Sequence, residues 1–243
     1  MHLLSTFYQK NWNLYKLKKI IIFDLDNTFY NYEEVQEVAL KSVFTFQDKF
    51  KKYNEFNEQY QIAREEVKNK LGGSTSVNNR VIYFKTLLEN IGEKDLSIAL
   101  NYENVYWENF IKNANLNNEL IKKIRNEKKE GYIYHLYTNL DTNTQLKKIN
   151  YWNLDFFDKI VTSEEAGYEK PHEKFIEYVT KDLDKFKKEN YKFYAIGDSV
   201  ENDLRPWKIL YDAETYLINN ESDSKYVDCQ GTFENCINKI IPN

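Results

Sequence analysis

Acidic side chains gather in two short segments of this 243-residue chain. Asp24 and Asp26 lie in the run DLDNT, and Asp198 and Asp203 lie in the run GDSVEND much later in the sequence. If the fold brings these segments together, their carboxylates repel one another unless a cation compensates the charge. Mg²⁺ typically takes one or two carboxylates together with the phosphate oxygens of a substrate. The acidic segments therefore predict metal-assisted phosphoryl chemistry.

A lysine and a hydroxyl could complete such a site. Lys170 precedes a proline, and Thr138 follows an apolar run. An ammonium group neutralises phosphoryl charge, and a hydroxyl can donate a hydrogen bond to a phosphoryl oxygen. Pro171 fits the first position of a helix, which would place Lys170 at a helix N-terminus. Because a cation there opposes the helix dipole, we expect an anionic group beside Lys170.

Buried strands would have to position these residues. Short runs rich in Ile, Tyr and Phe are typical of strands in a parallel sheet, and they span Lys18–Phe23, 132–137, Lys159–Thr162, 193–196 and 215–218. Helical patterns separate them, which favours an α/β fold with a doubly wound parallel sheet. Ligands of such sheets bind at the carboxyl ends of the strands, where the acidic segments and Thr138 are expected.

A different pattern occupies residues 29–115. Apolar residues recur there at helical spacing in four stretches and no strand pattern appears, which predicts a small helical bundle inserted after the first strand. The apolar positions of the first stretch include Val35, Val38, Val43 and Phe46. We therefore expect an α/β core formed by residues 1–28 and 116–243 and a helical domain formed by residues 29–115. Residues 1–16 form an extension to which the sequence assigns no role.

Composition excludes several classes of protein. No apolar run approaches the ~20 residues of a membrane span, and the N-terminus lacks the apolar core of a signal peptide. The two cysteines, Cys229 and Cys236, are too few for a disulfide framework. The net charge is −4 with lysines interleaved among acids, which gives no nucleic-acid-binding stripe. We expect a cytoplasmic protein, a monomer or weak homodimer, that binds neither nucleic acid nor membrane.

The four acidic, hydroxyl and lysine segments resemble the signature motifs of the haloacid dehalogenase-like (HAD) superfamily. FDLDNT is similar to the first motif, and Thr138-Asn139 after YIYHLY is similar to the second. TSEEAGYEKPHEKF resembles the third motif, with Lys170 as its lysine, and IGDSVENDL resembles the fourth. All four occur in the order of the family. The helical insert resembles the C1-type cap of the subgroup I members.

The resemblance implies a Mg²⁺-dependent phosphatase that hydrolyses a small phosphomonoester. Asp24 would be the nucleophile that forms an aspartyl-phosphate, and Asp26 would act as the general acid and then as the general base. Thr138 would hydrogen-bond a phosphoryl oxygen, and Lys170 would neutralise charge on the phosphoryl group.

The metal ligands also follow from the resemblance. The Asp24 carboxylate, the Asp26 carbonyl and Asp198 would hold Mg²⁺. Asp203 would orient Lys170 or metal-bound waters, although a residue of this type could instead cap the following helix. Gly197 would let the chain pass close to a ligand.

Substrate recognition is less clearly marked. Asn139, which follows Thr138 in the second motif, and Arg80 are the candidates for substrate binding. Arg80 is one of four arginines in the chain, and its planar fork would suit a phosphate or carboxylate. It could equally be an exposed or salt-bridged helix residue. Tyr30 and Tyr32 could line the cleft or pack the insert onto the core.

Three alternative functions are weighed against the phosphatase. A 2-haloacid dehalogenase of the same superfamily would lack the second aspartate of the first motif, so Asp26 argues against it. A phosphomutase would need groups that shield the aspartyl-phosphate from water, and no such groups can be identified. A non-catalytic phosphate-binding or regulatory protein, such as a phospho-acceptor receiver, would be about half this length and would have no use for a cap.

Overall fold

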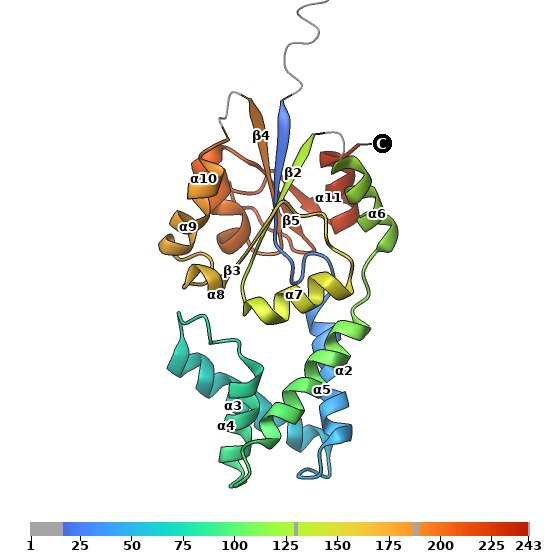
Figure 1. The fold of residues 1–243 in the computed structure, drawn as a ribbon, viewed down its shortest axis with the longest axis vertical. Coiled ribbons are helices and arrows are strands. Elements are labelled where there is room, and N and C mark those ends of the chain that lie inside the picture. Colours follow the sequence, from blue (N-terminus) through green and yellow to red (C-terminus); the bar gives the residue numbers. More distant parts are fainter. Residues whose placement is uncertain (1–16, 129–130, 187–189, 243) are drawn as a thin grey trace, which may run out of the picture.

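The sheet is the centre of the fold. A computed structural model describes residues 17–128, 131–186 and 190–242, so the predicted extension 1–16 lies outside the described residues. The described strands form a six-stranded sheet in the order β3-β2-β1-β4-β5-β6 (Figure 1), and every pair is parallel. The strands are β1 (Lys18–Phe23), β2 (Tyr132–Thr138), β3 (Lys159–Thr162), β4 (Tyr191–Gly197), β5 (Glu214–Ile218) and β6 (Cys229–Gly231). The predicted α/β class with a doubly wound parallel sheet is confirmed.

Both faces of the central strand β1 are buried. Ile21 and Phe23 pack into an apolar cluster on one face, and Ile20 and Ile22 pack into a second cluster on the other. Side chains of a strand alternate between its two faces, so a run that is apolar at every position needs cover on both. This requirement explains why KKIIIF forms a central strand.

Helices supply the cover. Helices α6 (Asn118–Glu127) and α11 (Phe233–Ile240) contribute to the cluster of Ile21, while α9 (Glu173–Leu183) and α10 (Arg205–Tyr211) contribute to that of Ile20. The remaining helices near the carboxyl ends of the strands are α7 (Thr142–Tyr151), α8 (Ser163–Ala166) and a π-helical turn, η2 (Val200–Leu204).

The strand prediction missed one element. Five strands lie where they are expected, with bounds that differ by at most two residues. The sixth, β6, has three residues that are all partly or fully exposed at the edge of the sheet. The side chains of β6 do not enter the core, so the sequence has no apolar run there that would predict a strand.

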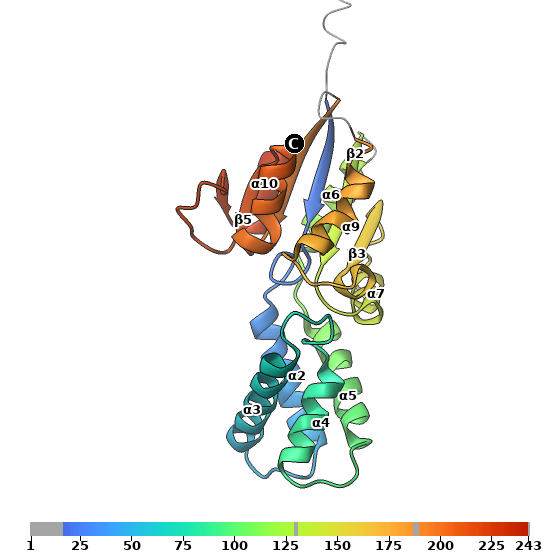
Figure 2. The same ribbon diagram turned by 90° about the vertical axis from the view of Figure 1, so that its left-hand side faces the viewer.

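The predicted helical insert consists of α2 (Tyr32–Phe46), α3 (Tyr53–Leu71), α4 (Arg80–Asn90) and α5 (Ile98–Asn113). The four helices lie beyond the carboxyl ends of the strands (Figure 1, Figure 2). Val35 and Val43 are buried as expected, whereas Val38 and Phe46 are 41% and 56% exposed, so their assignment to the packed face is wrong. These two positions lie at the edge of the apolar stripe of α2, where the bundle does not cover them.

The insert and the sheet share one apolar cluster. Tyr30, which follows β1, packs its ring against Phe110 of α5 and against Trp152 after α7. The insert is therefore packed against the carboxyl ends of the strands, where the acidic segments lie. Among the described residues, no helix combines the length and apolar character needed to cross a membrane.

Candidate active site

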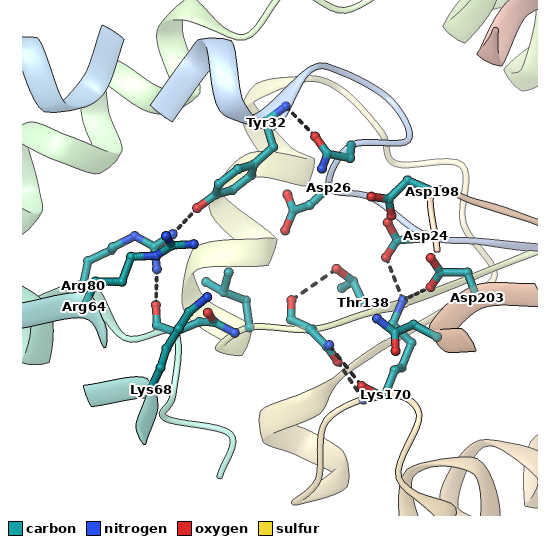
Figure 3. Close-up of a pocket in the computed structure, with 15 residues that line it drawn as sticks. Asp24, Asp26, Tyr32, Arg64, Lys68, Arg80, Thr138, Lys170, Asp198 and Asp203 are labelled. Atoms are coloured by element: carbon teal, nitrogen blue, oxygen red, sulfur yellow. Dashed lines mark hydrogen bonds and ion pairs between the residues drawn. The ribbon is translucent and has the colours of Figure 1, made fainter. Parts of the chain in front are cut away.

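Lys170 connects two of the acidic segments (Figure 3). Its Nζ lies 2.7 Å from Asp24 Oδ1 at the end of β1 and 2.7 Å from Asp203 Oδ1 in η2, and it donates to the Tyr137 carbonyl of β2 at 2.7 Å. Burial disfavours the charged amine, but the two carboxylates outweigh this effect and raise the pKa of Lys170. The expected anionic partner of Lys170 is thus present twice.

The expected helix start at Pro171 is wrong. Helix α9 begins at Glu173, and His172 caps it by accepting a hydrogen bond from the Lys174 amide at 3.2 Å. Pro171 instead follows Lys170 across a cis peptide bond, one residue before the cap. Lys170 is therefore held by Asp24 after β1, Asp203 of η2 and the Tyr137 carbonyl of β2, and not by the first turn of a helix.

Gly197 allows a close approach between the end of β4 and Asp203. A Cβ atom at this position would lie 2.4 Å from the Cβ of Asp203. The predicted close approach of this glycine to a ligand stays a prediction. Asp203 Oδ2 also accepts the Ser199 amide at 3.0 Å. Both oxygens of Asp203 are therefore engaged, one by Lys170 and one by the backbone of the β4–η2 connection.

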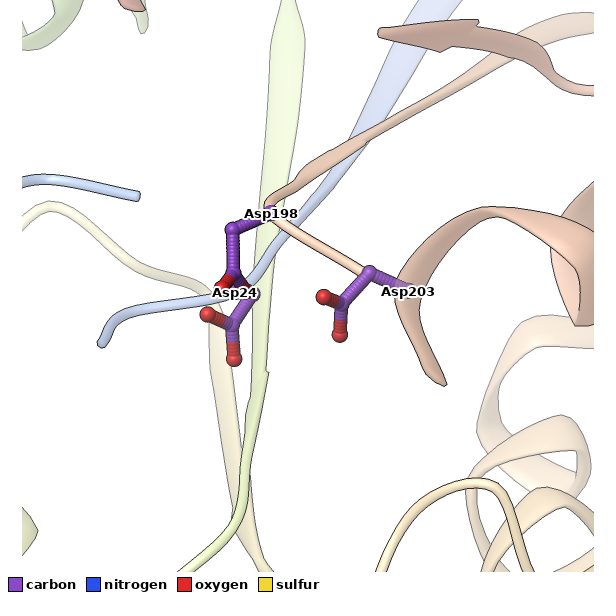
Figure 4. Close-up of side chains that lie close together, drawn as sticks. All are labelled: Asp24, Asp198 and Asp203. Carbon is purple, nitrogen blue, oxygen red and sulfur yellow. The ribbon is translucent and has the colours of Figure 1, made fainter. Parts of the chain in front are cut away.

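Three carboxylates can meet at one point (Figure 4). One oxygen from each of Asp24, Asp198 and Asp203 lies within 4.8 Å of the others. Burial, together with the neighbouring carboxylates, raises the pKa of Asp24 to about 7 and that of Asp198 to about 6. Lys170 alone does not offset the negative charge of three carboxylates. A set of ligands that are all oxygen atoms fits Mg²⁺. The oxygens of Asp203 are engaged by Lys170 and the Ser199 amide, and those of Asp24 by Lys170 and, at 3.2 Å, by the Thr28 hydroxyl. Asp198 forms no ion pair with a cation of the described chain, so it is the carboxylate most in need of a cation, and Asp24 lies beside it.

Asp26 points into a separate network. Its Oδ1 lies 2.7 Å from Lys148 Nζ and accepts a hydrogen bond from the Tyr30 hydroxyl, and its Oδ2 accepts Gln145 Nε2 at 3.1 Å. Burial by itself would raise the pKa of Asp26, but Lys148 and these hydrogen bonds outweigh burial and lower it. Asp26 is held as a carboxylate at the edge of the cavity.

Sequence reasoning missed Lys148 and Gln145. Both come from α7, and the side chain of Lys148 is fully buried between Asp26 and the rings of Trp107 and Phe110, whose centroids lie 5.1 and 5.2 Å from Nζ. Burial lowers the pKa of Lys148, and Asp26 counteracts it. No local pattern separates this lysine from the many solvated lysines of the chain.

The end of β2 holds the predicted hydroxyl and amide. Thr138 is buried, and its Oγ1 accepts Gln145 Nε2 at 2.7 Å. Asn139 Oδ1 accepts the Lys170 amide at 2.8 Å, and its Nδ2 lies 3.5 Å from the Lys170 carbonyl. The Asn139 side chain therefore holds the backbone of Lys170, and its predicted contact with substrate stays a prediction.

These side chains open into a cavity of about 400 Å³. Core residues line one side and the insert lines the other (Figure 3), so the cavity lies at the junction of the two parts. The core contributes Asp24, Asp26, Asn27, Thr138, Asn139, Leu140, Lys170, Asp198, Asn202 and Asp203, and the segment after β1 and the insert contribute Tyr32, Arg64, Lys68, Asn78 and Arg80.

Arg80 is neither exposed nor salt-bridged. It is the first residue of α4 and is only 4% exposed, and no carboxylate of the described chain lies within 4.0 Å of its guanidinium. It donates to the Tyr32 hydroxyl and to the Asn78 carbonyl. Tyr32 thus lines the cavity, whereas Tyr30 packs insert and core together. Arg64 and Lys68, which also line the cavity, were not anticipated.

Comparison with known proteins agrees with this geometry. The model of the haloacid dehalogenase-like hydrolase family matches residues 18–206. A ribulose-1,5-bisphosphate 5-phosphatase of Halopiger xanaduensis is 31% identical over 76% of this chain and 78% of its own length. A glyceraldehyde 3-phosphate phosphatase of Methanocaldococcus jannaschii is 30% identical over 79% of this chain and 81% of its own length.

A solved structure shows the same fold. The HAD-hydrolase YfnB of Bacillus subtilis, in a magnesium-bound crystal structure, superimposes with a TM-score of 0.68 at 22% sequence identity. The superposition covers 94% of this chain and 100% of YfnB, so it includes the helical insert as well as the sheet. The family match over residues 18–206, together with relatives at 30% identity or more, shows that this chain belongs to the haloacid dehalogenase-like hydrolases.

Proposed function

We propose that this protein is a Mg²⁺-dependent phosphatase that hydrolyses a small phosphomonoester through an aspartyl-phosphate on Asp24. The observation that carries the proposal is the environment of the Asp24 carboxylate. One of its oxygens is paired with Lys170 at 2.7 Å, and an Asp198 oxygen lies within 4.8 Å. A nucleophilic carboxylate beside a fixed lysine and an acidic ligand for Mg²⁺ suits attack on a phosphoryl group, whose charge Lys170 and the bound Mg²⁺ would neutralise.

Each step of the reaction is assigned to particular residues. Asp24 attacks phosphorus, so an Asp24 O–P bond forms as the P–O bond to the leaving group breaks, and Asp26 gives its proton to the leaving oxygen. In the second half, Asp26 takes a proton from water, the water oxygen bonds to phosphorus and the Asp24 O–P bond breaks. Lys170 offsets phosphoryl charge throughout, and the Thr138 hydroxyl donates to a phosphoryl oxygen.

Mg²⁺ would be held by the Asp24 carboxylate, Asp198 and the carbonyl of Asp26. When bound, it supplies a Lewis acid that lessens the repulsion between the phosphate and the attacking carboxylate. Asp203 would keep Lys170 in place. The negative charge of a bound phosphate would raise the pKa of Asp26 against the pull of Lys148, which makes the acid form accessible when substrate is present.

The helical segment 29–115 would act as a cap over this site and exclude water during the reaction. The two relatives named as phosphatases act on small sugar or triose phosphates, and we infer a small soluble phosphate ester here as well. A cytoplasmic location agrees with the two cysteines, Cys229 and Cys236, both of which are free.

The intermediate provides the test. Wild-type protein mixed with substrate and quenched in acid is reduced with borohydride, digested and analysed by mass spectrometry. Reduction of an aspartyl-phosphate converts the residue to homoserine, so the peptide containing residue 24 should lose the mass difference between the two residues. Asp24→Asn is the matched control and should show no conversion. Turnover without any trapped intermediate at residue 24, under conditions that trap a known aspartyl-phosphate enzyme, would refute the mechanism.

A further inference from the structure

The two ends of the active-site cavity carry opposite charge. Four aspartates lie at the core end, and Arg64, Lys68 and Arg80 approach from the insert on the other side (Figure 3). Arg64 and Lys68 are four residues apart on α3 and therefore lie on one face of that helix. Arg80 comes from the start of α4, so two helices bring three cations to one wall of the cavity.

Arg80 is fixed in place without a counterion. Its guanidinium lies 5.1 Å from the ring centroid of Tyr83 and 5.4 Å from those of Tyr106 and Trp107. Its Nε is buried and has no hydrogen-bond partner, and the two groups that it does bind, the Tyr32 hydroxyl and the Asn78 carbonyl, are uncharged. Burying an arginine without a carboxylate is costly, so a charge in this position is best explained by an anion that arrives with a ligand.

Arg64 and Lys68 add to this positive wall. Arg64 donates to Gln61 at 3.3 Å, and within the described chain no carboxylate lies within 4.0 Å of either cation. Glu169 is the acidic residue that influences Lys68, but its Oε1 accepts the Asn78 amide at 3.0 Å and its side chain is not part of the cavity lining. The wall therefore keeps an excess of positive charge that faces the cavity.

We infer that Arg64, Lys68 and Arg80 bind a second anionic group of the substrate. The substrate class is then a small phosphomonoester that carries a further phosphate or carboxylate, with the reacting phosphate at Asp24 and the second anion at the insert. The inference rests on the proposed phosphatase function. Guanidinium forks bind both kinds of anion in a bidentate manner, and a cavity of about 400 Å³ admits only a small molecule.

Matched substrates test this directly. Glycerol 3-phosphate, 3-phosphoglycerate and glycerol 1,3-bisphosphate share a three-carbon chain and differ in the group at the far end, and ribulose 5-phosphate and ribulose 1,5-bisphosphate form a longer pair. We expect kcat/KM for at least one doubly anionic member to exceed that of its singly anionic partner by about tenfold or more, the effect of one or two charge-assisted hydrogen bonds. Among the three-carbon substrates, the highest kcat/KM for 3-phosphoglycerate would indicate a carboxylate as the second anion, and the highest kcat/KM for glycerol 1,3-bisphosphate would indicate a phosphate. Ratios below about twofold in every pair would overturn the inference.

Variants locate the effect. Lys68→Gln and Arg64→Gln should each reduce the ratio of kcat/KM for the doubly anionic substrate to kcat/KM for its singly anionic partner by about fivefold or more. Lys70→Gln is the control, because Lys70 is exposed on the same helix and does not line the cavity. Arg80→Gln should lower the ratio furthest, but it removes a buried side chain, so the variants of Arg64, which is half-buried, and Lys68, which is exposed, carry the test. A ratio that both variants retain would overturn the inference.

Binding separates this inference from the proposed chemistry. Calorimetric Kd values for the same ligands are measured on Asp24→Asn protein with Mg²⁺, where no turnover is needed. A doubly anionic ligand that binds about tenfold more tightly than its partner supports the second anion site even if the wild type hydrolyses nothing, in which case only the phosphatase proposal fails. Equal Kd values together with hydrolysis of p-nitrophenyl phosphate would leave the phosphatase proposal standing and reject the second anion site.

Discussion

The two ends of the cavity are built in different ways. At the core end, Lys170 contacts two carboxylates and a carbonyl at 2.7 Å, and Asp26 is bound by Lys148, Tyr30 and Gln145. At the insert end, Arg80 lies among aromatic rings with two uncharged acceptors and a buried Nε without a partner. The core end is electrostatically almost complete before any substrate arrives, apart from a metal ion, whereas the insert end is incomplete.

This difference separates chemistry from selection. Preorganised charges at strand ends lower the barrier because they need not move during the reaction. A wall with unsatisfied charge instead favours those ligands that supply the missing anion, and it disfavours those that leave it buried and unpaired. The core would therefore set the rate of the reaction and the insert would set its substrates. The following changes test that division, from the largest expected effect to the smallest.

Asp24→Asn should abolish the chemistry while leaving the insert intact. The amide has the same shape but no nucleophilic oxygen charge, so kcat for p-nitrophenyl phosphate should fall by about 10⁴-fold. Lys170 keeps its contact with Asp203, so the melting temperature by circular dichroism should stay within about 5 °C. Asp223→Asn, an exposed acidic position, is the control. Turnover at more than a tenth of the wild-type rate would remove Asp24 from its assigned role.

Removal of Mg²⁺ by chelation should reduce the activity strongly and reversibly. With EDTA, activity should fall by about 10³-fold and return on addition of Mg²⁺, because, in the described part of the chain, Lys170 is then the one cation left to offset the charge of Asp24, Asp198 and the phosphoryl group. Mg²⁺ at about 100 times its Kd should also raise the free energy of unfolding by about 2.7 kcal/mol, measured by urea denaturation. Asp198→Asn should lose most of this stabilisation. Full activity in EDTA would show that the acidic cluster works without a metal.

Lys148→Met tests the contact between the core and the insert. Lys148 touches Asp26 of the core and the rings of Trp107 and Phe110 of the insert. Methionine keeps the apolar contacts but leaves Asp26 without its cation, so kcat/KM should fall by about 10- to 100-fold for substrates with one or two anionic groups alike. Lys147→Met, at the exposed neighbouring position, is the matched control. A loss confined to doubly anionic substrates would instead place Lys148 in substrate selection.

Tyr32→Phe should have the smallest effect. The ring keeps its contact with Phe110 at a centroid distance of 5.1 Å, while the hydrogen bond to Arg80 is lost. A hydrogen bond to a charged group such as the Arg80 guanidinium contributes about 1.5 kcal/mol or more, so KM for the preferred doubly anionic substrate should rise about tenfold, with a smaller change in kcat. Steady-state kinetics measure kcat and KM separately. A larger change in kcat than in KM would mean that Tyr32 serves the chemistry at the core end.

Prediction from sequence succeeded where the pattern is local. Five strands and the four helices of the insert follow from apolar spacing, and the edge strand β6 was missed because its residues do not enter the core. Of the predicted site residues, Asp24 and Asp198 follow β1 and β4 and Thr138 is the last residue of β2, and parallel strands bring these positions to one edge of the sheet. Their roles in catalysis stay predictions. Pro171 was misassigned as a helix start, because the helix begins at Glu173, after a cis peptide bond and the His172 cap, which the local motif does not reveal.

The sequence by itself thus determined five buried strands, the four helices that follow β1 and the proximity of Asp24, Thr138 and Asp198, because the composition of each strand predicts its burial and parallel strands end at one edge of the sheet. Only the tertiary structure decided that Lys148 pairs with Asp26, that Arg80 is buried without a counterion, and that Arg64 and Lys68 join it. The physical reason is that these contacts join helices distant in sequence. Whether a given lysine or arginine is solvated or faces a cavity depends on how those helices pack, and the residue pattern within a single helix does not predict that packing.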